Sequence, residues 1–313
     1  MILCCGEALV DMIPERQPDG RLAYMPHAGG AVYNTAVALG RLGVTTGLLS
    51  GVSTDPFGAL LERGLDEAGV DTSALIRSAR LTTLAMVHLE DGSASYSFYD
   101  ENSAGRAITA AQLPELSQDV TALYFGGISL VAEPAADTYA TLLSRAAPDH
   151  LVMLDPNIRP DFITDEIAYR NRLGRMIAQS DIVKVSDEDL EWLLPGEDPL
   201  PVKAAALRVQ GPQIVIVTEG EDGATAFAAA WQVHVPAPAA RVVDTVGAGD
   251  TFNAGVLAGL DAEGCLSKLA IAGIGRNSMR RALALGAEVA AITVSRAGAD
   301  APWRHELAGA PDA

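Results

Sequence analysis

The sequence has few basic residues and no stretch that is rich in them. It holds 22 Lys and Arg against 40 Asp and Glu, which gives a formal net charge of −18. Proteins that bind nucleic acid or anionic membranes need a basic patch, so we expect neither kind of partner. If so acidic a chain binds an anion, its site should provide backbone N–H groups, a metal cation or an isolated Lys or Arg.

Cysteines are also few, and long hydrophobic segments are absent. Cys4, Cys5 and Cys265 lack the spacing to histidine or to one another that a metal site requires. We expect buried thiols of a reducing compartment, with Cys4 and Cys5 on opposite faces of a strand. No uncharged apolar run is long enough to span a bilayer, and the N-terminus lacks the basic start of a signal peptide. These features predict a cytoplasmic protein.

Several common catalytic signatures are missing. The sequence has no GxxxxGK[ST], HExxH or GxSxG motif, and its five histidines form no pattern. Gly247 and Gly249 have the first spacing of a dinucleotide-binding GxGxxG, but Phe252 occupies the place of the third glycine. P-loop chemistry is therefore excluded, and a dinucleotide-dependent oxidoreductase is disfavoured.

Short runs rich in Val, Ile and Leu alternate with helical patterns along most of the chain. The predicted strands are Ile2–Cys5, Thr46–Val52, Ala122–Phe125, Leu151–Leu154, Ile182–Val185 and Ile214–Val217. The predicted helices are Asn34–Leu42, Pro56–Ala68, Ala135–Ala146, Ile167–Ala178, Val202–Val209 and most of Asp250–Ala284. This alternation predicts a three-layer α/β fold with a mostly parallel sheet covered on both faces.

Two segments interrupt this rhythm. Val10–Pro26 and Thr82–Tyr99 alternate in polarity around turn signals at Pro18-Asp19-Gly20 and Asp91-Gly92. They predict two hairpins that build a small antiparallel sheet beside the main one. No repeat or long linker is present, so we expect a single domain over 1–313 that carries a β appendage from 11–25 and 82–100. Gly309–Ala313 is expected to be frayed.

The strongest chemical signal is the segment Asp244-Thr-Val-Gly-Ala-Gly-Asp-Thr-Phe-Asn-Ala-Gly255. Gly247, Ala248 and Gly249 lead directly into a helix that is expected to start near Asp250. Glycines let successive N–H groups face outward, and the helix N-terminus adds partial positive charge. This predicts an anion hole built without Lys or Arg, with Asp250 beside it. The alternative is that Asp250 only caps the helix.

Three other segments are candidates for binding loops. Ala28–Asn34 is rich in glycine and opens a helix, and Thr218–Gly223 directly follows a strand; either could be only a turn. Asp155-Pro-Asn-Ile-Arg-Pro160 also follows a strand, and ligands of open α/β sheets bind beyond the carboxyl ends of strands. Its two prolines hold Arg159, which is expected either to bind a ligand or to pair with Asp155 or Asp161.

DTVGAGDTFNAG at 244–255 resembles the C-terminal signature of the ribokinase-like sugar kinases, the phosphofructokinase-B family. The Gly29-Gly30…Asn34 segment resembles its N-terminal signature, and the similarity extends over nearly the whole chain. Within the family, GEALVDMI at 6–13 and DPNIRP at 155–160 are most similar to fructokinases and 2-keto-3-deoxygluconate kinases. The resemblance implies transfer of the ATP γ-phosphoryl group to a sugar hydroxyl, and a β lid that often forms a dimer contact.

The resemblance also implies roles for individual residues. Asp250 would take the hydroxyl proton while Gly247, Ala248 and Gly249 hold the phosphoryl group. The sugar would contact Asp11, Gly29, Gly30, Asn34 and Arg159. The nucleotide would contact Asn157, Lys184, Ser186, Thr218, Gly220, Gly223 and Asn277. Mg²⁺ would be needed beside Asp189, and K⁺ could bind near Asp244 and a loop around 286–298.

Two departures from the family pattern bear on the substrate and the metal. Ser186-Asp-Glu-Asp189 stands where many relatives have Asn-x-x-Glu, which is thought to organise Mg²⁺ and phosphate. Tyr99-Asp-Glu-Asn102 stands where many 2-keto-3-deoxygluconate kinases have a Tyr-Arg pair for the substrate carboxylate. Two carboxylates there favour a neutral sugar, so fructose is the expected substrate. A keto-acid kinase, a nucleoside kinase and a sugar-binding regulator without catalysis remain alternatives.

Overall fold

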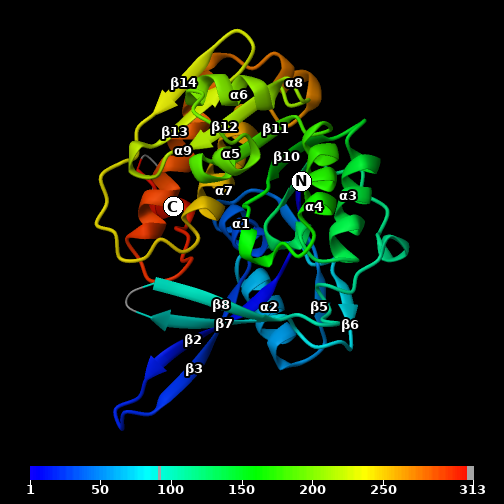
Figure 1. Ribbon diagram of the computed structural model, residues 1–313, viewed down its shortest axis with the longest axis vertical. Helices are drawn as coiled ribbons and strands as arrows, with labels where there is room; N and C mark the ends of the chain where they lie inside the picture. The colour runs from blue at the N-terminus through cyan, green and yellow to red at the C-terminus, as the bar shows by residue number, and fades with distance from the viewer. Residues whose placement is uncertain (91–92, 309–313) are drawn as a thin grey trace.

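The computed structural model describes residues 1–90 and 93–308. An eight-stranded sheet runs through the body of the described chain in the order β14-β13-β12-β11-β10-β9-β1-β4 (Figure 1). Its strands are β1 (Ile2–Cys5), β4 (Thr46–Leu49), β9 (Ala122–Gly126), β10 (Leu151–Asp155), β11 (Ile182–Ser186), β12 (Ile214–Thr218), β13 (Ala224–Phe227) and β14 (Gln232–Val235). The pairs from β4 to β12 are parallel, and β13 and β14 continue antiparallel. The mostly parallel sheet is confirmed.

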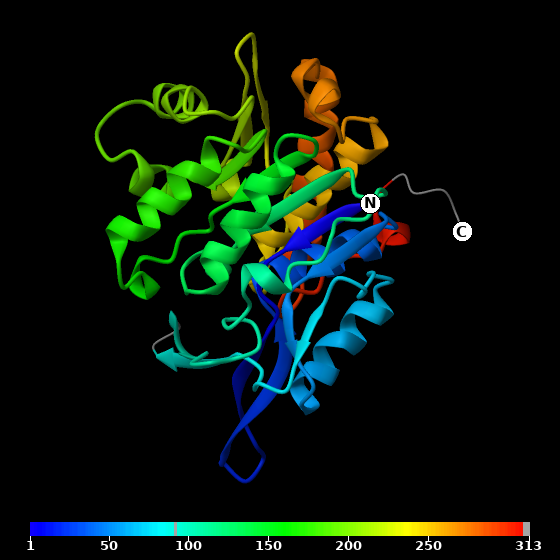
Figure 2. The same ribbon diagram turned by 90° about the vertical axis from the view of Figure 1, so that its right-hand side faces the viewer.

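Helices cover both faces of this sheet, which makes the three layers that the sequence predicts (Figure 2). One face is covered by α1 (Ala31–Arg41), α2 (Pro56–Glu67), α7 (Ala248–Ala262), α8 (Lys268–Ala272) and α9 (Arg276–Val294). The other is covered by α3 (Ala135–Ala146), α4 (Glu166–Ile177), α5 (Asp187–Leu193) and α6 (Leu200–Arg208). Short 3₁₀ turns are η1 (Ala110–Gln112), η2 (Ile128–Leu130), η3 (Pro160–Phe162), η4 (Gly220–Asp222) and η5 (Arg304–Glu306).

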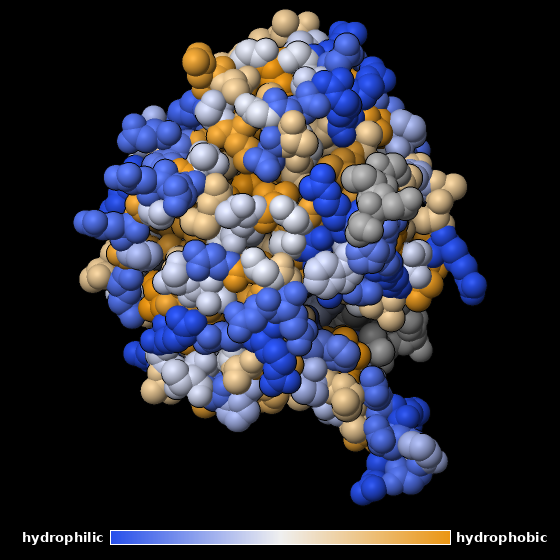
Figure 3. Space-filling view, turned by 180° about the vertical axis from the view of Figure 1, so that it is seen from behind, coloured by the Kyte–Doolittle hydropathy of each residue, from blue (hydrophilic) through white to orange (hydrophobic). Residues whose placement is uncertain are grey.

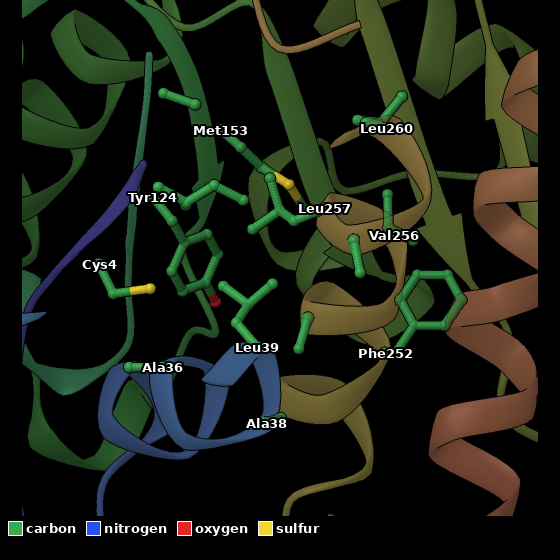
Figure 4. Packing of buried hydrophobic residues seen from close by; sticks show 14 of the residues in the cluster. Cys4, Ala36, Ala38, Leu39, Tyr124, Met153, Phe252, Val256, Leu257 and Leu260 are labelled. Atoms are coloured by element: carbon green, nitrogen blue, oxygen red, sulfur yellow. The ribbon is translucent and has the colours of Figure 1, made fainter. Parts of the chain in front are cut away.

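The core lies on both sides of the sheet and is mainly aliphatic. Cys4 packs on the α1 and α7 side and Cys5 on the α3 side, as the strand period predicts, and both are free buried thiols. Figure 4 shows Leu39 of α1 and Leu257 of α7 gathered around Tyr124 and Met153 of the sheet. This packing holds α1 and α7 side by side, so residues at the starts of the two helices can meet.

Four predicted boundaries were wrong. The predicted strand 46–52 is two strands, because β4 pairs with β1 whereas β5 (Gly51–Ser53) leaves that sheet to pair with β6 (Ile76–Ser78). Helix α1 begins at Ala31 rather than Asn34, because Gly30 already serves as its N-cap. Helix α7 likewise begins at Ala248. In the C-terminal part, α9 continues to Val294, ten residues beyond the predicted end.

A second sheet with the strand order β3-β2-β7-β8 forms the lid that the sequence predicts, lying below the body in Figure 1. Its strands are β2 (Leu9–Arg16), β3 (Leu22–Gly29), β7 (Leu84–Glu90) and β8 (Ser93–Tyr99). Each hairpin is antiparallel, but β2 and β7 pair in parallel, so the expectation of a wholly antiparallel sheet was wrong. Figure 3 shows the hydrophilic tip of the β2–β3 hairpin projecting from the body. The Asp91-Gly92 turn and Gly309–Ala313 lie outside the described residues.

None of the helices in the described part of the chain has the length and apolarity that crossing a bilayer needs.

Candidate active site

Asp250 lies in the first turn of α7 and is only 8% exposed. Asn34 of α1 donates a hydrogen bond from Nδ2 to Oδ2 of Asp250 over 2.9 Å. The neighbouring Thr35 donates from Oγ1 to the backbone oxygen of Asp250 over 3.1 Å. The starts of α1 and α7 are therefore joined at this carboxylate, and the N-terminal and C-terminal glycine segments meet although more than 200 residues separate them.

Burial raises the pKa of Asp250 to about 7. The hydrogen bond from Asn34 and the ammonium group of Lys184 act in the opposite direction, whereas the carboxylates of Asp155 and Glu7 raise the pKa further. A carboxylate with a pKa near neutrality is a competent proton acceptor at physiological pH. In a carboxylate that only caps a helix, the N–H groups and the positive end of the helix dipole would stabilise the ionised form and lower the pKa instead.

The turn before Asp250 exposes the N-terminus of α7. Gly247 is the N-cap residue with φ +77°, a left-handed conformation that glycine adopts at no steric cost, and no side chain caps the helix. A Cβ built on Gly249 would lie 3.5 Å from Nζ of Lys184, which places the ammonium group beside this turn. Backbone N–H groups and one isolated lysine thus come together, which are the elements that an acidic protein needs to bind an anion.

Lys184 is buried and is held by Asp155 at the end of β10. Its Nζ lies 3.0 Å from Oδ2 of Asp155. The same oxygen accepts a hydrogen bond from Nδ2 of Asn253 over 2.6 Å, and that amide also contacts the hydroxyl of Tyr124 at 2.9 Å. Asn157, with φ +44°, donates its N–H to Oδ1 of Asp155. Asp155 therefore connects β10 and β11 to α7 at Asn253, which lies one helical turn after Asp250.

Sequence reasoning missed this network of Asp155, Asn253 and Tyr124 and the buried Glu7. A signal existed for Asn253, which follows Asp250 by three residues and so lies on the same face of the predicted helix. Glu7, Tyr124 and Asp155 belong to three separate strands or the loop directly after one, and no local spacing connects them.

Four of the predicted sugar-binding residues, Asp11, Gly29, Gly30 and Asn34, lie where the lid strands β2 and β3 lead into α1, whereas Arg159 lies in the loop after β10. A Cβ on Gly29 would overlap Oδ2 of Asp11, so that carboxylate lies against the glycine pair. Burial raises the pKa of Asp11 to about 6. Arg159 is exposed and donates to the backbone oxygen of Ile158 at 3.0 Å. In residues 1–90 and 93–308 it forms no ion pair, so the predicted alternative of pairing with Asp155 or Asp161 was wrong.

The hydroxyl of Tyr96 on the lid strand β8 lies near enough to Asp11 and Arg159 for both charges to act on it. Burial raises the pKa of its hydroxyl, Asp11 raises it further, and Arg159 lowers it. Phe98 on the same strand packs edge-to-face on Phe162 of η3, with ring centroids 4.8 Å apart. The lid thus reaches the loop that carries Arg159.

The predicted nucleotide-binding residues lie at the ends of β11 and β12 and at the start of α9. Ser186 and Thr218 are register partners in the two strands. Gly220 and Gly223 bound the η4 turn that follows, and Asn277 is exposed in the first turn of α9. A hollow of about 470 Å³ lies next to these segments, with Glu219 and Thr225 near the end of β12 and Arg280 on α9 in its lining. The other lining residues are Leu200, Pro201, Phe227, Gln232, Val233 and His234.

The two predicted metal-binding carboxylates accept hydrogen bonds from backbone N–H groups. Asp189 accepts from Ile158 at 3.0 Å and forms a capping box with Ser186, and Asp244 accepts from Val246 at 3.0 Å and Gly298 at 2.8 Å. The described residues contain no group of three or more His, Cys, Asp or Glu that could hold a metal by themselves. This arrangement fits Mg²⁺, which binds through few protein carboxylates and mainly through substrate phosphates.

One part of the predicted K⁺ site was wrong. The expected loop around 286–298 begins inside α9, where Gly286 packs closely on the backbone of Phe252. This helix continues to Val294, whose carbonyl oxygen accepts from the N–H groups of Val243 at 2.8 Å and Asp244 at 3.2 Å. Within 286–298, the non-helical residues are those after Val294, and the N–H of Gly298 among them donates to Asp244.

A family model described as pfkB family carbohydrate kinase matches residues 1–306. The chain belongs to this family. A fructokinase of Rhizobium leguminosarum bv. trifolii is 47% identical over 281 residues, which cover 90% of this chain and 86% of that protein. The crystal structure of a fructokinase with bound ATP from Xylella fastidiosa has a TM-score of 0.86 and 30% identity, covering 95% of this chain and 93% of that one.

A fructokinase structure from Vibrio cholerae O395, in a form with bound fructose, ADP and calcium ion, has a TM-score of 0.80 and 25% identity, with 95% of this chain and 94% of that chain covered. The predicted ribokinase-like fold and the predicted class of carbohydrate kinase are thus confirmed.

Proposed function

We propose that this carbohydrate kinase phosphorylates fructose and that Asp250 is its catalytic base. The observation that carries the proposal is the position of Asp250. Its buried carboxylate has a pKa near 7 and lies between Asn34 of the glycine-rich segment and the uncapped N-terminus of α7 beside Lys184. The fructokinase relatives support the choice of sugar.

The residues at this site suit an in-line phosphoryl transfer. Asp11, Gly29, Gly30, Asn34 and Arg159 are assigned to the sugar, and Asn157, Ser186, Thr218, Gly220, Gly223 and Asn277 to the nucleotide. The sugar hydroxyl oxygen bonds to the γ-phosphorus, the bond from that phosphorus to the ADP oxygen breaks, and the hydroxyl proton passes to Asp250. The N–H groups of Gly247–Gly249 and the ammonium of Lys184 stabilise the charge on the transferring group.

The competing substrate is 2-keto-3-deoxygluconate, and the lid segment bears on the choice. Asp100 forms an ion pair with Arg106 at 2.9 Å, so one of the two carboxylates expected to repel an acid is neutralised. Glu101 remains exposed. The segment offers no cation of its own in the place of the family's Tyr-Arg pair, and a neutral sugar is therefore favoured.

We expect kcat/KM for fructose to exceed that for 2-keto-3-deoxygluconate by at least about tenfold, which corresponds to about 1.4 kcal/mol in transition-state binding. A coupled assay of ADP release with both compounds and a nucleoside measures this directly. Preference for the keto-acid by the same factor would assign the other activity, and no ADP release with any sugar would indicate a regulator without catalysis.

The pH dependence of the reaction should report on Asp250. Only its ionised form accepts a proton, so we expect kcat/KM for fructose to rise with pH through about 7, the value to which burial raises the pKa in the free protein. The acid limb should be far above the ordinary pKa of an aspartate. A profile that is flat through neutrality and falls only near that ordinary value would contradict the burial argument.

We propose Mg²⁺ as the metal ion, placed beside Asp189 and held mainly by the ATP phosphates, and K⁺ as an activator near Asp244. The support is the chain's net charge of −18, which leaves ATP poorly neutralised without a cation, and the Asp244–Gly298 contact. In the same assay, omission of Mg²⁺ should abolish turnover. Equal rates in K⁺ and in a bulky organic cation would exclude the second claim.

We also propose a homodimer formed through the lid, in the cytoplasm. Leu22 and Met25 on the edge strand β3 and Tyr99 on the other edge strand β8 are exposed, and free thiols suit a reducing compartment. Sedimentation of the chain and of a Leu22→Asp variant tests the dimer. A monomeric mass for both proteins would exclude it.

A further inference from the structure

Glu7 is a buried carboxylate that the proposed chemistry does not use. It follows β1 and is 8% exposed. Its Oε1 accepts a hydrogen bond from the N–H of Ala31 over 2.9 Å, and its Oε2 accepts one from the N–H of Ser129 over 3.2 Å. One side chain thus joins the start of α1 to the η2 turn after β9.

These contacts hold the first turn of α1, which has no capping side chain of its own. Gly30 is the N-cap and makes no side-chain cap bond, while the backbone oxygen of Glu7 accepts from Tyr33 over 3.2 Å. Glu7 therefore supplies from outside the helix the bonds that an N-cap residue usually supplies. The same helical turn carries Asn34, which is bonded to Asp250.

The close fit around the carboxylate shows that the space is built for it. A Cβ on Gly127 would overlap both carboxylate oxygens, and a Cβ on Gly30 would lie 3.0 Å from Cγ of Glu7. Both carboxylate oxygens accept a hydrogen bond from a backbone N–H. Although burial raises the pKa of Glu7, these N–H donors and the N-terminus of α1 favour the ionised form.

We propose that Glu7 is a positioning residue, whose carboxylate fixes the glycine pair and the first turn of α1 so that Asn34 meets Asp250. The proposal deepens the proposed function and rests on it for its kinetic readout. The Glu7 charge also raises the pKa of Asp250, so kinetics are compared at a pH well above that pKa, where Asp250 is ionised in every variant. Because Glu7 acts through Asn34, its effect on kcat/KM at that pH must disappear when the Asn34 side chain is absent. A residue that only stabilised the fold would have the same effect in both backgrounds.

The test is a double-mutant cycle of Glu7→Gln with Asn34→Ala. Gln keeps the shape but has one oxygen and one NH₂ group, so either Ala31 of α1 or Ser129 loses its acceptor, and the charge at the start of α1 is lost in both cases. We expect kcat/KM for fructose to fall by about ten- to a hundredfold in the otherwise wild-type chain, the order that a misplacement of about 1 Å costs. In the Asn34→Ala background the same change should cost no more than about twofold. KM for ATP should stay unchanged.

Tyr139→Phe is the matched control. The Tyr139 hydroxyl donates to the backbone oxygen of Gly6 over 2.9 Å, so its loss disturbs the same loop without touching the Glu7 carboxylate. We expect lower thermal stability but no coupling to Asn34. If Glu7→Gln fails to fold, Glu7→Asp, which keeps the charge but is one methylene shorter, takes its place in the cycle.

A second readout does not depend on any substrate. Amide hydrogen exchange of residues 31–35 should be faster in Glu7→Gln than in wild type or Tyr139→Phe. Unchanged exchange, or equal kinetic losses in both backgrounds, would overturn the positioning role. Faster exchange in a chain whose wild type does not phosphorylate fructose would uphold the role of Glu7 in holding α1 and reject the proposed substrate instead.

Discussion

Asp250→Asn is expected to lower kcat by about 10² to 10⁴-fold, the usual contribution of a general base, while the protein stays folded. The asparagine oxygen can still accept the hydrogen bond from Asn34 and can still occupy the first turn of α7. The amide cannot take a proton, so the loss should appear in kcat more than in KM, since the proton is accepted only as the transition state forms.

The same change should not reduce stability at neutral pH. The pKa of Asp250 is raised from 3.8 to about 7 in the folded protein. A carboxyl group with a raised folded-state pKa favours the fold at low pH and loses that contribution as pH rises from 3.8 through 7. Replacing it by a neutral amide removes this loss, so the thermal midpoint at pH 8 should equal or exceed that of wild type.

Differential scanning calorimetry and steady-state kinetics on the two proteins measure both effects. A variant that melts like wild type and retains more than about a tenth of its rate, far above what loss of a base leaves, would show that Asp250 is only a cap. A strongly destabilised variant would show that the carboxylate holds α7 in place.

The contiguous part of this site could be predicted from the sequence. Gly247, Gly249 and Asp250 are neighbours in the chain, and the chemistry of a glycine-rich turn before a helix can be recognised locally. The layers of the fold follow from alternating strand and helix patterns in the same way. The parallel pairing of β2 with β7 could not be predicted, because it joins segments about 70 residues apart and no turn fixes its register.

The groups that support the site could not be predicted either. Glu7 follows β1, Asp155 ends β10 and Lys184 lies within β11, so their positions relative to one another depend on strand order rather than on spacing. The sequence left open that Arg159 pairs with Asp155 or Asp161 instead of binding a ligand. In the structure Asp155 points to Lys184 in the next strand, because two buried charges must pair whereas an exposed arginine remains hydrated.

Lys184→Met is expected to have the second large effect, on both stability and catalysis. Lys184 and Asp155 are 5% and 1% exposed, so removal of the ammonium leaves a buried carboxylate without its counter-charge. Breaking a buried pair in this way costs about 3 to 5 kcal/mol of unfolding free energy. The N–H of Asn157 and the amide of Asn253 still donate to Asp155 in this variant. We therefore expect a loss of unfolding free energy near the lower end of that range.

The catalytic loss has a separate cause, namely the position of the ammonium group beside Gly249. An ammonium at the anion hole neutralises charge that develops on the transferring phosphoryl group. Loss of one such donor costs about 10² to 10³-fold in kcat. Urea denaturation measures the loss of unfolding free energy, and steady-state kinetics on the folded fraction measure the loss of kcat. One preparation of the variant therefore gives both quantities separately.

The double variant Lys184→Met with Asp155→Asn distinguishes the two roles of the lysine. Without the aspartate, no buried charge of this pair is left without its counter-charge, and the asparagine oxygen can still accept from Asn253, so most of the lost stability should return. Activity should stay low, because the ammonium beside Gly249 is still missing. Recovery of turnover together with stability would mean that Lys184 serves only to balance Asp155, and that the N–H groups at the start of α7 and the metal ion suffice to bind the phosphoryl group.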